Sequence, residues 1–431
     1  MYRNLSIKSL AVNLKKRSIA SFSSSVRIRR IFSMAITFVI TILFSSCTSE
    51  NTNRYFDDDN MPLIDGKRTF IIGSYHHPKT ETPFKTLSQN GFNYVRVNAD
   101  SAQISEAARN NLNVWIYTNA IDEKNSESSK KSLKEVITKF KNHSNLLFWE
   151  IEDEPAYTWM SKEARVSPEK LKTAYDFIKS IDNSHAIFTN HAPVNLISTL
   201  KRYNNSCELV AVDVYPVVPH GIKPTYALHR DGLQGDLLNT YISQVGEYID
   251  KMKIVIEDKK PVFAVLQGFA WEMLKPENER DTSMILYPTY EQSRFMAYNA
   301  IVHGAKGVIY WGTNYTPQPS QFITDLYRVT GELAGMQEVL SAKDAENSIS
   351  IEYHELGHSV DTGVEFITKS INGKMYLITT NSDKNPVKVT FSGLNNLKGV
   401  AVLKENRTFK IEDGKFTDEY KPFGVHLYKI E

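Results

Sequence analysis

Short apolar runs alternate with helical patterns from about residue 69 onward, and this alternation organises most of the chain. Eight runs rich in β-branched and aromatic residues predict strands at residues 70–75, 94–98, 114–118, 146–151, 186–190, 209–215, 262–267 and 307–311. Helical patterns between them include residues 132–141, 171–181, 241–252 and 290–303. This order predicts βα units, in which successive strands run parallel.

Capping signals support several of these helices. Ser167 stands before Pro168, the combination of an N-cap with proline at the first helical position. Thr289 is followed three residues later by Gln292, which has the form of a capping box. The helix that begins after Thr289 is expected to end at Gly304.

Eight βα alternations over about 270 residues match a (β/α)8 TIM barrel in number and length. The alternative is a doubly wound open sheet. No Gly-x-Gly-x-x-Gly turn follows the first strand, so nothing supports a dinucleotide site. We therefore expect the barrel, with long loops at 216–239 and 268–289 beside its carboxyl-end cleft.

The pattern changes after a last helix at about 322–340. Short alternating runs at 374–380, 387–391 and 425–430, with turn residues between them, predict an antiparallel β-sandwich. The expected organisation is a signal segment at 1–46, a flexible tether at 47–66, the barrel at 67–344 and the sandwich at 345–431.

The amino-terminal segment has the three parts of an export signal. Residues 1–46 contain eight basic residues and no acid, an apolar run covers 31–44, and Ser45-Ser46-Cys47 follows. The apolar run is short for a bilayer span. The segment resembles a bacterial lipobox, which implies lipid attachment at Cys47 and an extracytoplasmic protein anchored to a bacterial membrane, at the outer membrane or cell surface. An uncleaved anchor or a soluble secreted product is the alternative.

Charge and cysteine content exclude other classes of protein. Without its first 46 residues the chain has 43 basic and 49 acidic residues, a net charge of −6, which argues against nucleic acid as a partner. Cys47 and Cys207 are its only cysteines, so no disulfide framework is expected.

Residues 149–155 read Trp-Glu-Ile-Glu-Asp-Glu-Pro and directly follow apolar residues of the fourth predicted strand. Acids are costly to bury without partners, and proline ends a sheet ladder. The segment therefore marks a strand that leaves the core and enters a site that uses carboxylates.

The carboxyl ends of the eight strands gather carboxylate, amide and aromatic side chains on one rim of the barrel. These are Arg96, Asn98, Tyr117, Asp153, Glu154, Asn190, His191, Asp213, Tyr215, Gln267, Tyr310 and Trp311. Such side chains suit a carbohydrate, with hydrogen bonds for hydroxyls and rings for apolar sugar faces. We expect no metal site and no cofactor, because no thiolate or histidine cluster is present.

At this point the chain resembles the clan of (β/α)8 glycoside hydrolases that includes cellulases, mannanases and β-galactosidases. In that clan strand four ends Asn-Glu-Pro, with the Glu as general acid/base. Asp153-Glu154-Pro155, with Arg96 on strand two and Trp311 on strand eight, stands at the matching positions. The resemblance implies that Glu154 is the proton donor and that Trp311 stacks on a sugar.

Two departures from the clan matter. Asp153 replaces the Asn, and its charge beside Glu154 would raise the pKa of that acid. Gln267 ends strand seven, where the clan has its Glu nucleophile, and an amide cannot form the glycosyl ester. Glu272, the next acid along, is therefore our expected nucleophile or base, with Asp213 as second choice.

The predicted function is hydrolysis of O-glycosidic bonds, β-linked by analogy, in a poly- or oligosaccharide. Arg96, Asn98, Tyr117, Asp153, Asn190, Asp213, Tyr215, Gln267 and Trp311 are the expected substrate contacts. The competing interpretation is a catalytically silent, glycan-binding lipoprotein that kept the barrel. Nothing in the sequence implies a protein partner.

Overall fold

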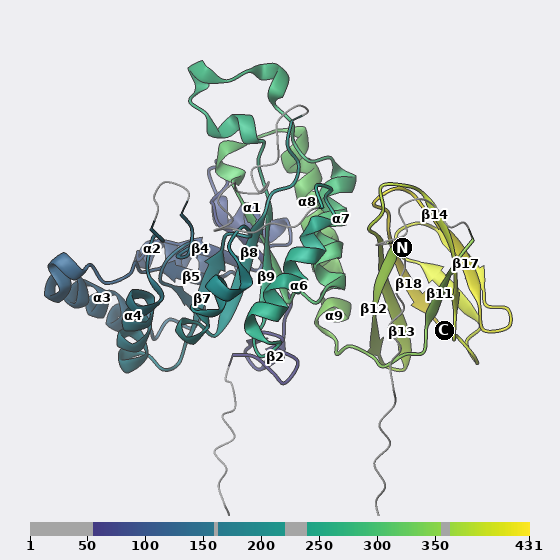
Figure 1. The fold of residues 1–431 in the computed structure, drawn as a ribbon, viewed down its shortest axis with the longest axis horizontal. Helices are drawn as coiled ribbons and strands as arrows, with labels where there is room; N and C mark the ends of the chain where they lie inside the picture. The colour runs from purple at the N-terminus through teal and green to yellow at the C-terminus, as the bar shows by residue number, and fades with distance from the viewer. Residues whose placement is uncertain (1–54, 159–162, 220–238, 355–362) are drawn as a thin grey trace, which may run out of the picture. The chain divides into compact units, whose positions relative to one another are not determined.

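The computed structural model describes residues 55–158, 163–219, 239–354 and 363–431. Eight parallel strands form a closed barrel in the order β10-β3-β4-β5-β6-β7-β8-β9 (Figure 1). They are β3 (Ile71–Ser74), β4 (Tyr94–Val97), β5 (Asn113–Tyr117), β6 (Leu146–Glu150), β7 (Ala186–His191), β8 (Leu209–Val214), β9 (Val262–Gln267) and β10 (Gly307–Trp311). The predicted (β/α)8 barrel is confirmed.

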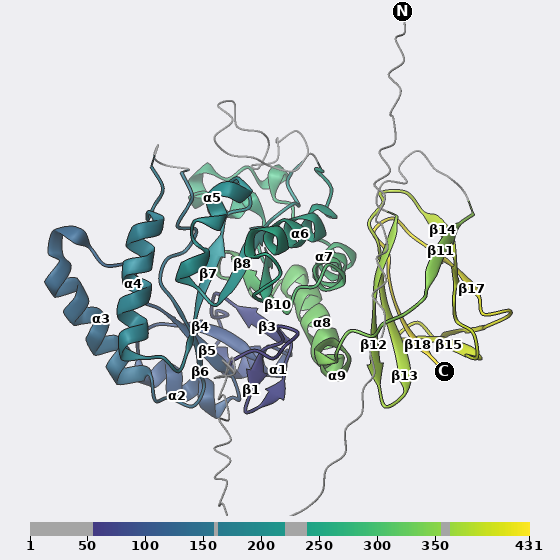
Figure 2. The same cartoon turned by 60° about the horizontal axis from the view of Figure 1, so that its bottom comes forward.

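Helices surround the barrel on its outer side (Figure 2). They are α1 (Pro83–Gln89), α2 (Ser101–Arg109), α3 (Ser126–Phe140), α4 (Pro168–Ile181), α5 (Ile197–Lys201), α6 (Gln244–Ile256), α7 (Tyr290–Val302), α8 (Gln321–Gly335) and α9 (Gln337–Ser341). Both predicted N-caps are present: Ser167 accepts the Lys170 N–H, and Thr289 forms a capping box with Gln292. The single helix expected at 322–340 is the pair α8 and α9.

Alternate residues of each barrel strand face opposite sides, because side chains of a strand alternate with period two. Inward positions carry large rings, including Tyr94, Trp115, Phe148, Phe188 and Phe263, all at most 2% exposed. Outward positions are mostly aliphatic and join a second core with the helices. The barrel interior is thus filled by side chains.

The residues before the first barrel strand belong to the folded body. Strands β1 (Leu63–Ile64) and β2 (Lys67–Arg68) form a hairpin. Phe56 is 2% exposed and stacks on Phe148, with ring centroids 5.9 Å apart. The predicted tether at 47–66 is therefore wrong from residue 55 onward, because two buried aromatic rings fix this part to the barrel.

The carboxyl-terminal part contains two antiparallel sheets, which confirms the predicted β-sandwich. One sheet has β11 (Ser350–Tyr353), β14 (Val387–Ser392) and β17 (Phe416–Tyr420). The other has β12 (Val364–Ile371), β13 (Lys374–Asn381), β18 (Val425–Ile430), β15 (Gly399–Val402) and β16 (Arg407–Lys410). Phe391 and Phe416 stack at 4.9 Å in a core that Tyr428 completes.

Candidate active site

Period-two alternation assembles the site at the carboxyl ends of the barrel strands. Inward positions above the aromatic layer are Arg96, Tyr117, Glu150, Asn190, Asp213, Gln267 and Trp311, in register with the inward rings below them. His191 and Tyr310 have the opposite parity. His191 contacts Tyr203 outside the barrel, and Tyr310 packs in the outer core, so these two predicted rim residues do not face the site.

Glu154 lies in a tight turn just after β6. Its φ is 47°, in the left-handed region, which is uncommon for a residue other than glycine. Its N–H donates to the Asn190 carbonyl at 3.0 Å, and its own carbonyl accepts the Tyr157 N–H at 3.0 Å. Since strained backbone persists only where its surroundings fix it, the orientation of the Glu154 side chain is built into the fold.

Asp153, Glu154 and Asp213 form what we call the acid cluster. The Asn190 side chain ties two of them together, because its Nδ2 donates to Asp153 Oδ1 and to Asp213 Oδ1, each at 2.9 Å. Two such bonds to one nitrogen leave the two oxygens no more than about 6 Å apart. The Glu154 carboxyl group lies close enough to Asp213 for its charge to raise the pKa of Asp213. Carboxylates packed this closely repel each other, which favours a proton on one of them.

Burial and mutual repulsion keep protons on the acid cluster. Burial, and then the charge of Asp153, raises the pKa of Glu154 to about 7, although Arg165 counteracts this. Burial also raises the pKa of Asp213 well above its ordinary value, and the charge of Glu154 adds to the effect. The contribution of Asp153 agrees with the sequence prediction. Near neutral pH the pair can therefore donate a proton.

Glu150 lies beneath the acid cluster and is fully buried. It accepts hydrogen bonds from Trp115 Nε1 at 2.8 Å and from the Tyr75 hydroxyl at 3.3 Å. Arg96 Nε lies 3.7 Å from its carboxylate, and the Arg96 guanidinium covers the Tyr117 ring at 4.7 Å. Glu150, Arg96 and Tyr117 thus form one supporting network.

Gln267 has a structural role in this arrangement. It is fully buried, and its Nε2 donates to the carbonyls of Val217 and Phe269 at 2.9 and 3.1 Å. Its Oε1 accepts the Val217 N–H at 3.0 Å. Because backbone groups take both amide protons and also bond the amide oxygen, Gln267 holds the loops after β8 and β9 together, in place of the predicted substrate contact.

Glu272 faces its own loop. It lies in a 3₁₀ turn, Trp271–Leu274, and is 2% exposed. Its carboxylate accepts the Asp281 N–H at 2.7 Å and pairs with Lys275 at 2.9 Å, and these two contacts lower its pKa. In the part of the chain that the structure describes, its hydrogen bonds and its ion pair go to this loop and not to the acid cluster. Glu272, the predicted nucleophile, therefore stabilises its own loop. Asp213, the second choice, is the acid that lies beside Glu154.

Aromatic rings form one wall of the site. Trp311 stacks on Tyr215 with centroids 5.7 Å apart and meets the Phe269 ring edge-on at 5.1 Å. Trp271 Nε1 donates to the Tyr215 carbonyl at 3.2 Å. Trp311 remains partly exposed. The wall therefore presents an aromatic surface that a sugar ring could stack against.

Some predicted and unpredicted residues complete the site. Asn98 follows β4 and is exposed, with its N–H bonded to Gln103. Arg165, which the sequence analysis missed, lies 3.3 Å from Glu154. No local sequence signal marks it, because it stands in the polar segment before α4. Within the described ranges, no group of three His, Cys, Asp or Glu side chains is arranged to hold a metal ion.

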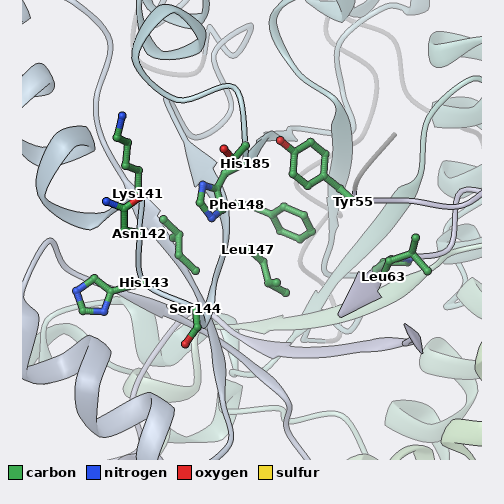
Figure 3. A pocket seen from close by; sticks show the side chains of 12 residues that line it. Tyr55, Leu63, Lys141, Asn142, His143, Ser144, Leu147, Phe148 and His185 are labelled. Carbon is green, nitrogen blue, oxygen red and sulfur yellow. The ribbon is translucent and has the colours of Figure 1, made fainter. Parts of the chain in front are cut away.

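A pocket of about 330 Å³ lies at the opposite, amino end of the barrel (Figure 3). Its walls come from Tyr55, the segment before β6, including Lys141 and His143, and the residues just before β7, including His185. No acidic side chain lines it. Acid chemistry therefore belongs to the carboxyl end, where (β/α)8 barrels place their active sites.

No protein-family model and no curated protein matches the chain. Solved structures of glycoside hydrolases do. A family 5 glycoside hydrolase from Bacteroides vulgatus superposes with a TM-score of 0.55 at 11% identity, over 88% of this chain and 94% of that one. A family 27 β-L-arabinopyranosidase variant from Geobacillus stearothermophilus, in complex with arabinose, gives 0.54 at 10% identity, over 84% and 97%.

An α-amylase from Geobacillus thermoleovorans, complexed with acarbose, gives a TM-score of 0.52 at 7% identity, over 85% of this chain and 99% of that one. These three enzymes belong to different groups of glycoside hydrolases. The chain therefore has the (β/α)8 fold of glycoside hydrolases, and its own chemistry must be argued from its own site.

Proposed function

We propose that the protein hydrolyses O-glycosidic bonds in a poly- or oligosaccharide, with β linkages expected from its resemblance to the cellulase and mannanase clan. The observation that carries the proposal is the buried acid cluster, in which Asn190 joins Asp153 to Asp213 and burial raises the pKa of Glu154 to about 7. A buried acid with a pKa of about 7 is suited to protonate a leaving group. The fold shared with glycoside hydrolases supports the same class of reaction.

In this proposal Glu154 donates its proton to the glycosidic oxygen as the bond to the anomeric carbon breaks. Asp213 replaces Glu272 as the second carboxylate; in its ionised form it either attacks the anomeric carbon or takes a proton from the attacking water. The two groups of a working pair stand about 5 Å apart in retaining enzymes and about 6.5–9.5 Å apart in inverting ones.

The remaining side chains would bind the sugar. Asn190 is 1% exposed, and its Oδ1 has no hydrogen-bond partner among the residues that the structure describes. A substrate hydroxyl could supply the missing donor. Asp153 would accept from a further hydroxyl, and the exposed part of Trp311 would stack on an apolar sugar face.

The test compares wild type with Glu154→Gln, Asp213→Asn and Glu272→Gln on β-glucans, mannans and galactans, measuring released reducing ends and binding separately. We expect Glu154→Gln and Asp213→Asn to lose at least about 100-fold in turnover while still binding, since an acid catalyst supplies about 10²–10⁴-fold. Glu272→Gln is the matched loop control, and we expect it to stay within about threefold of wild type. Full turnover in Glu154→Gln would refute the proposal.

Gln267 motivates one second candidate, a glycan-binding protein without hydrolytic activity. An amide occupies the strand position that the clan reserves for its nucleophile, and its hydrogen bonds go to backbone groups. Saccharide binding by wild type, with no sugar released from any polysaccharide of the panel, would establish this alternative. Release that depends on Glu154 would exclude it.

We also propose that lipid attached to Cys47 anchors the protein outside the cytoplasm, at a bacterial membrane. Cys47 lies outside the described residues, so the proposal depends on the lipobox resemblance. In the parts of the chain that the structure describes, no helix is long and apolar enough to cross a bilayer. Labelling with a radioactive fatty acid in the native host tests the proposal. Absent label, or label that survives Cys47→Ala, would refute it.

A further inference from the structure

Arg165 joins the segment before α4 to the turn that carries Glu154. Its Nη2 lies 3.3 Å from Glu154 Oε2, and its Nη1 donates to the Asp153 carbonyl at 3.0 Å. One guanidinium therefore holds both the carboxylate of Glu154 and the backbone just before it. The planar fork of arginine suits such a double contact, whereas the ammonium of lysine is a single point charge.

The backbone around Arg165 is fixed at several points. The Arg165 N–H donates to the Tyr157 carbonyl at 3.3 Å, and the Val166 N–H donates to the Pro155 carbonyl at 3.0 Å. The next residue, Ser167, caps α4. The guanidinium also lies 5.7 Å from the Tyr157 ring centroid. Arg165 thus starts from a rigid position on the same folded segment as Glu154.

We propose that Arg165 is a positioning residue that keeps Glu154 in its left-handed turn and fixes the direction of its carboxyl group within the acid cluster. The inference rests on the proposed role of Glu154 as proton donor. The Glu154 N–H bond to Asn190 fixes only the backbone side of the turn. On the side-chain side, Asp213 is itself an acid, so Arg165 supplies the positive charge in contact with the Glu154 carboxylate among the described residues.

The charged and titratable groups around Glu154 determine whether removing Arg165 raises or lowers the pKa of Glu154. Asp153 from its own turn raises its pKa, whereas Arg165 from the segment before α4 and, to a smaller extent, Asp213 on β8 lower it. Tyr157 also faces Glu154 and stays neutral, because burial raises its pKa to about 12. Removing Arg165 should therefore raise the pKa of Glu154 further.

The experiment compares wild type, Arg165→Met, Arg165→Lys and the control Arg202→Met. Arg202 forms an ion pair with Glu169 at 3.3 Å, the same distance as between Arg165 and Glu154, but both side chains of this pair are more than half exposed. Two readouts are taken: the pH profile of kcat/KM on a saccharide that wild type cleaves, and the titration of Glu154 by carbon-13 NMR of labelled glutamate, assigned with Glu154→Gln. The NMR readout does not require hydrolytic activity.

For Arg165→Met we expect the titration of Glu154, and the alkaline limb of the profile, to move up by about one pH unit. We expect kcat to fall about tenfold with KM nearly unchanged. The substitution shifts the catalytic acid from its position but leaves the groups that bind the sugar in place. Arg165→Lys should restore the pH limb but only part of kcat, and Arg202→Met should match wild type. Thermal unfolding at one pH shows whether each variant folds. If Arg165→Met does not fold, Arg165→Lys is compared with wild type by itself.

Two results would overturn the positioning role: a Glu154 titration unchanged in Arg165→Met, or an equal loss of kcat in Arg165→Lys and Arg165→Met without any pH shift. Failure of the proposed function looks different. In that case Glu154→Gln retains the turnover of wild type, while the NMR titration still reports whether Arg165 acts on Glu154.

Discussion

Burial of Glu154 makes the folded protein sensitive to alkaline pH, and Glu154→Gln should remove part of that sensitivity. The pKa of the acid rises from 4.5 to about 7 on folding. The folded state therefore binds the proton more tightly than the unfolded chain. The stability from this group is fully present below pH 4.5 and is lost as the pH rises through 7. A glutamine is neutral at every pH and resembles the protonated acid in shape.

The magnitude follows from the two pKa values. At about 1.4 kcal/mol per pH unit, the rise corresponds to about 3 kcal/mol at pH 8 and less than about 1 kcal/mol at pH 5. The difference in free energy of unfolding between Glu154→Gln and wild type should therefore be about 2–3 kcal/mol more favourable to the variant at pH 8 than at pH 5. For a folded body of this size the gain corresponds to roughly 3–4 °C in Tm.

Differential scanning calorimetry of both proteins at pH 5 and pH 8 measures this difference. Glu81→Gln is the control, because Glu81 is exposed. The difference in Tm between Glu81→Gln and wild type should be the same at pH 5 and at pH 8. A Glu154→Gln variant whose change in Tm is the same at pH 5 and pH 8 would refute the reasoning, since it would show that folding does not raise the pKa of Glu154.

Three further predictions concern other parts of the barrel. Gln267→Ala leaves buried backbone groups of Val217 and a neighbouring carbonyl unpaired, so the free energy of unfolding in urea should fall by about 3 kcal/mol. Arg294→Met removes the guanidinium that binds Glu332 bidentately, so this carboxylate, 9% exposed, keeps only the hydroxyls of Tyr290 and Tyr298 among the described residues; urea unfolding should show a loss of about 3–5 kcal/mol. Trp311→Ala should weaken saccharide binding about tenfold in calorimetric titration, because it removes the exposed stacking surface.

The sequence predicts the barrel well because its signal is repeated and local. The strands at residues 262–267 and 307–311 match β9 and β10 at both ends. Period-two alternation then brings Asn190 and Asp213 to the same inner face. The amino-terminal hairpin was missed because its strands have only two residues each, too few to show a period.

The contacts of individual acids could not be predicted in the same way. The interpretation of Glu272 used its distance along the sequence from Gln267, but the fold turns its carboxylate toward Lys275 and the Asp281 N–H. The contact of Glu154 with Arg165 depends on how the chain returns to start α4. Such contacts follow from the paths of loops, which have no periodic pattern in the sequence.

The ring of Phe56, packed against Phe148, decides where a shortened version of this protein can begin. Expression from residue 67, the start suggested by the polar sequence before it, would remove this ring and the first strand of the hairpin. The aromatic layer at the amino end of the barrel would then meet water, at a cost of about 3–5 kcal/mol for the loss of one buried phenylalanine. A soluble, crystallisable fragment should therefore retain Tyr55 and every residue after it.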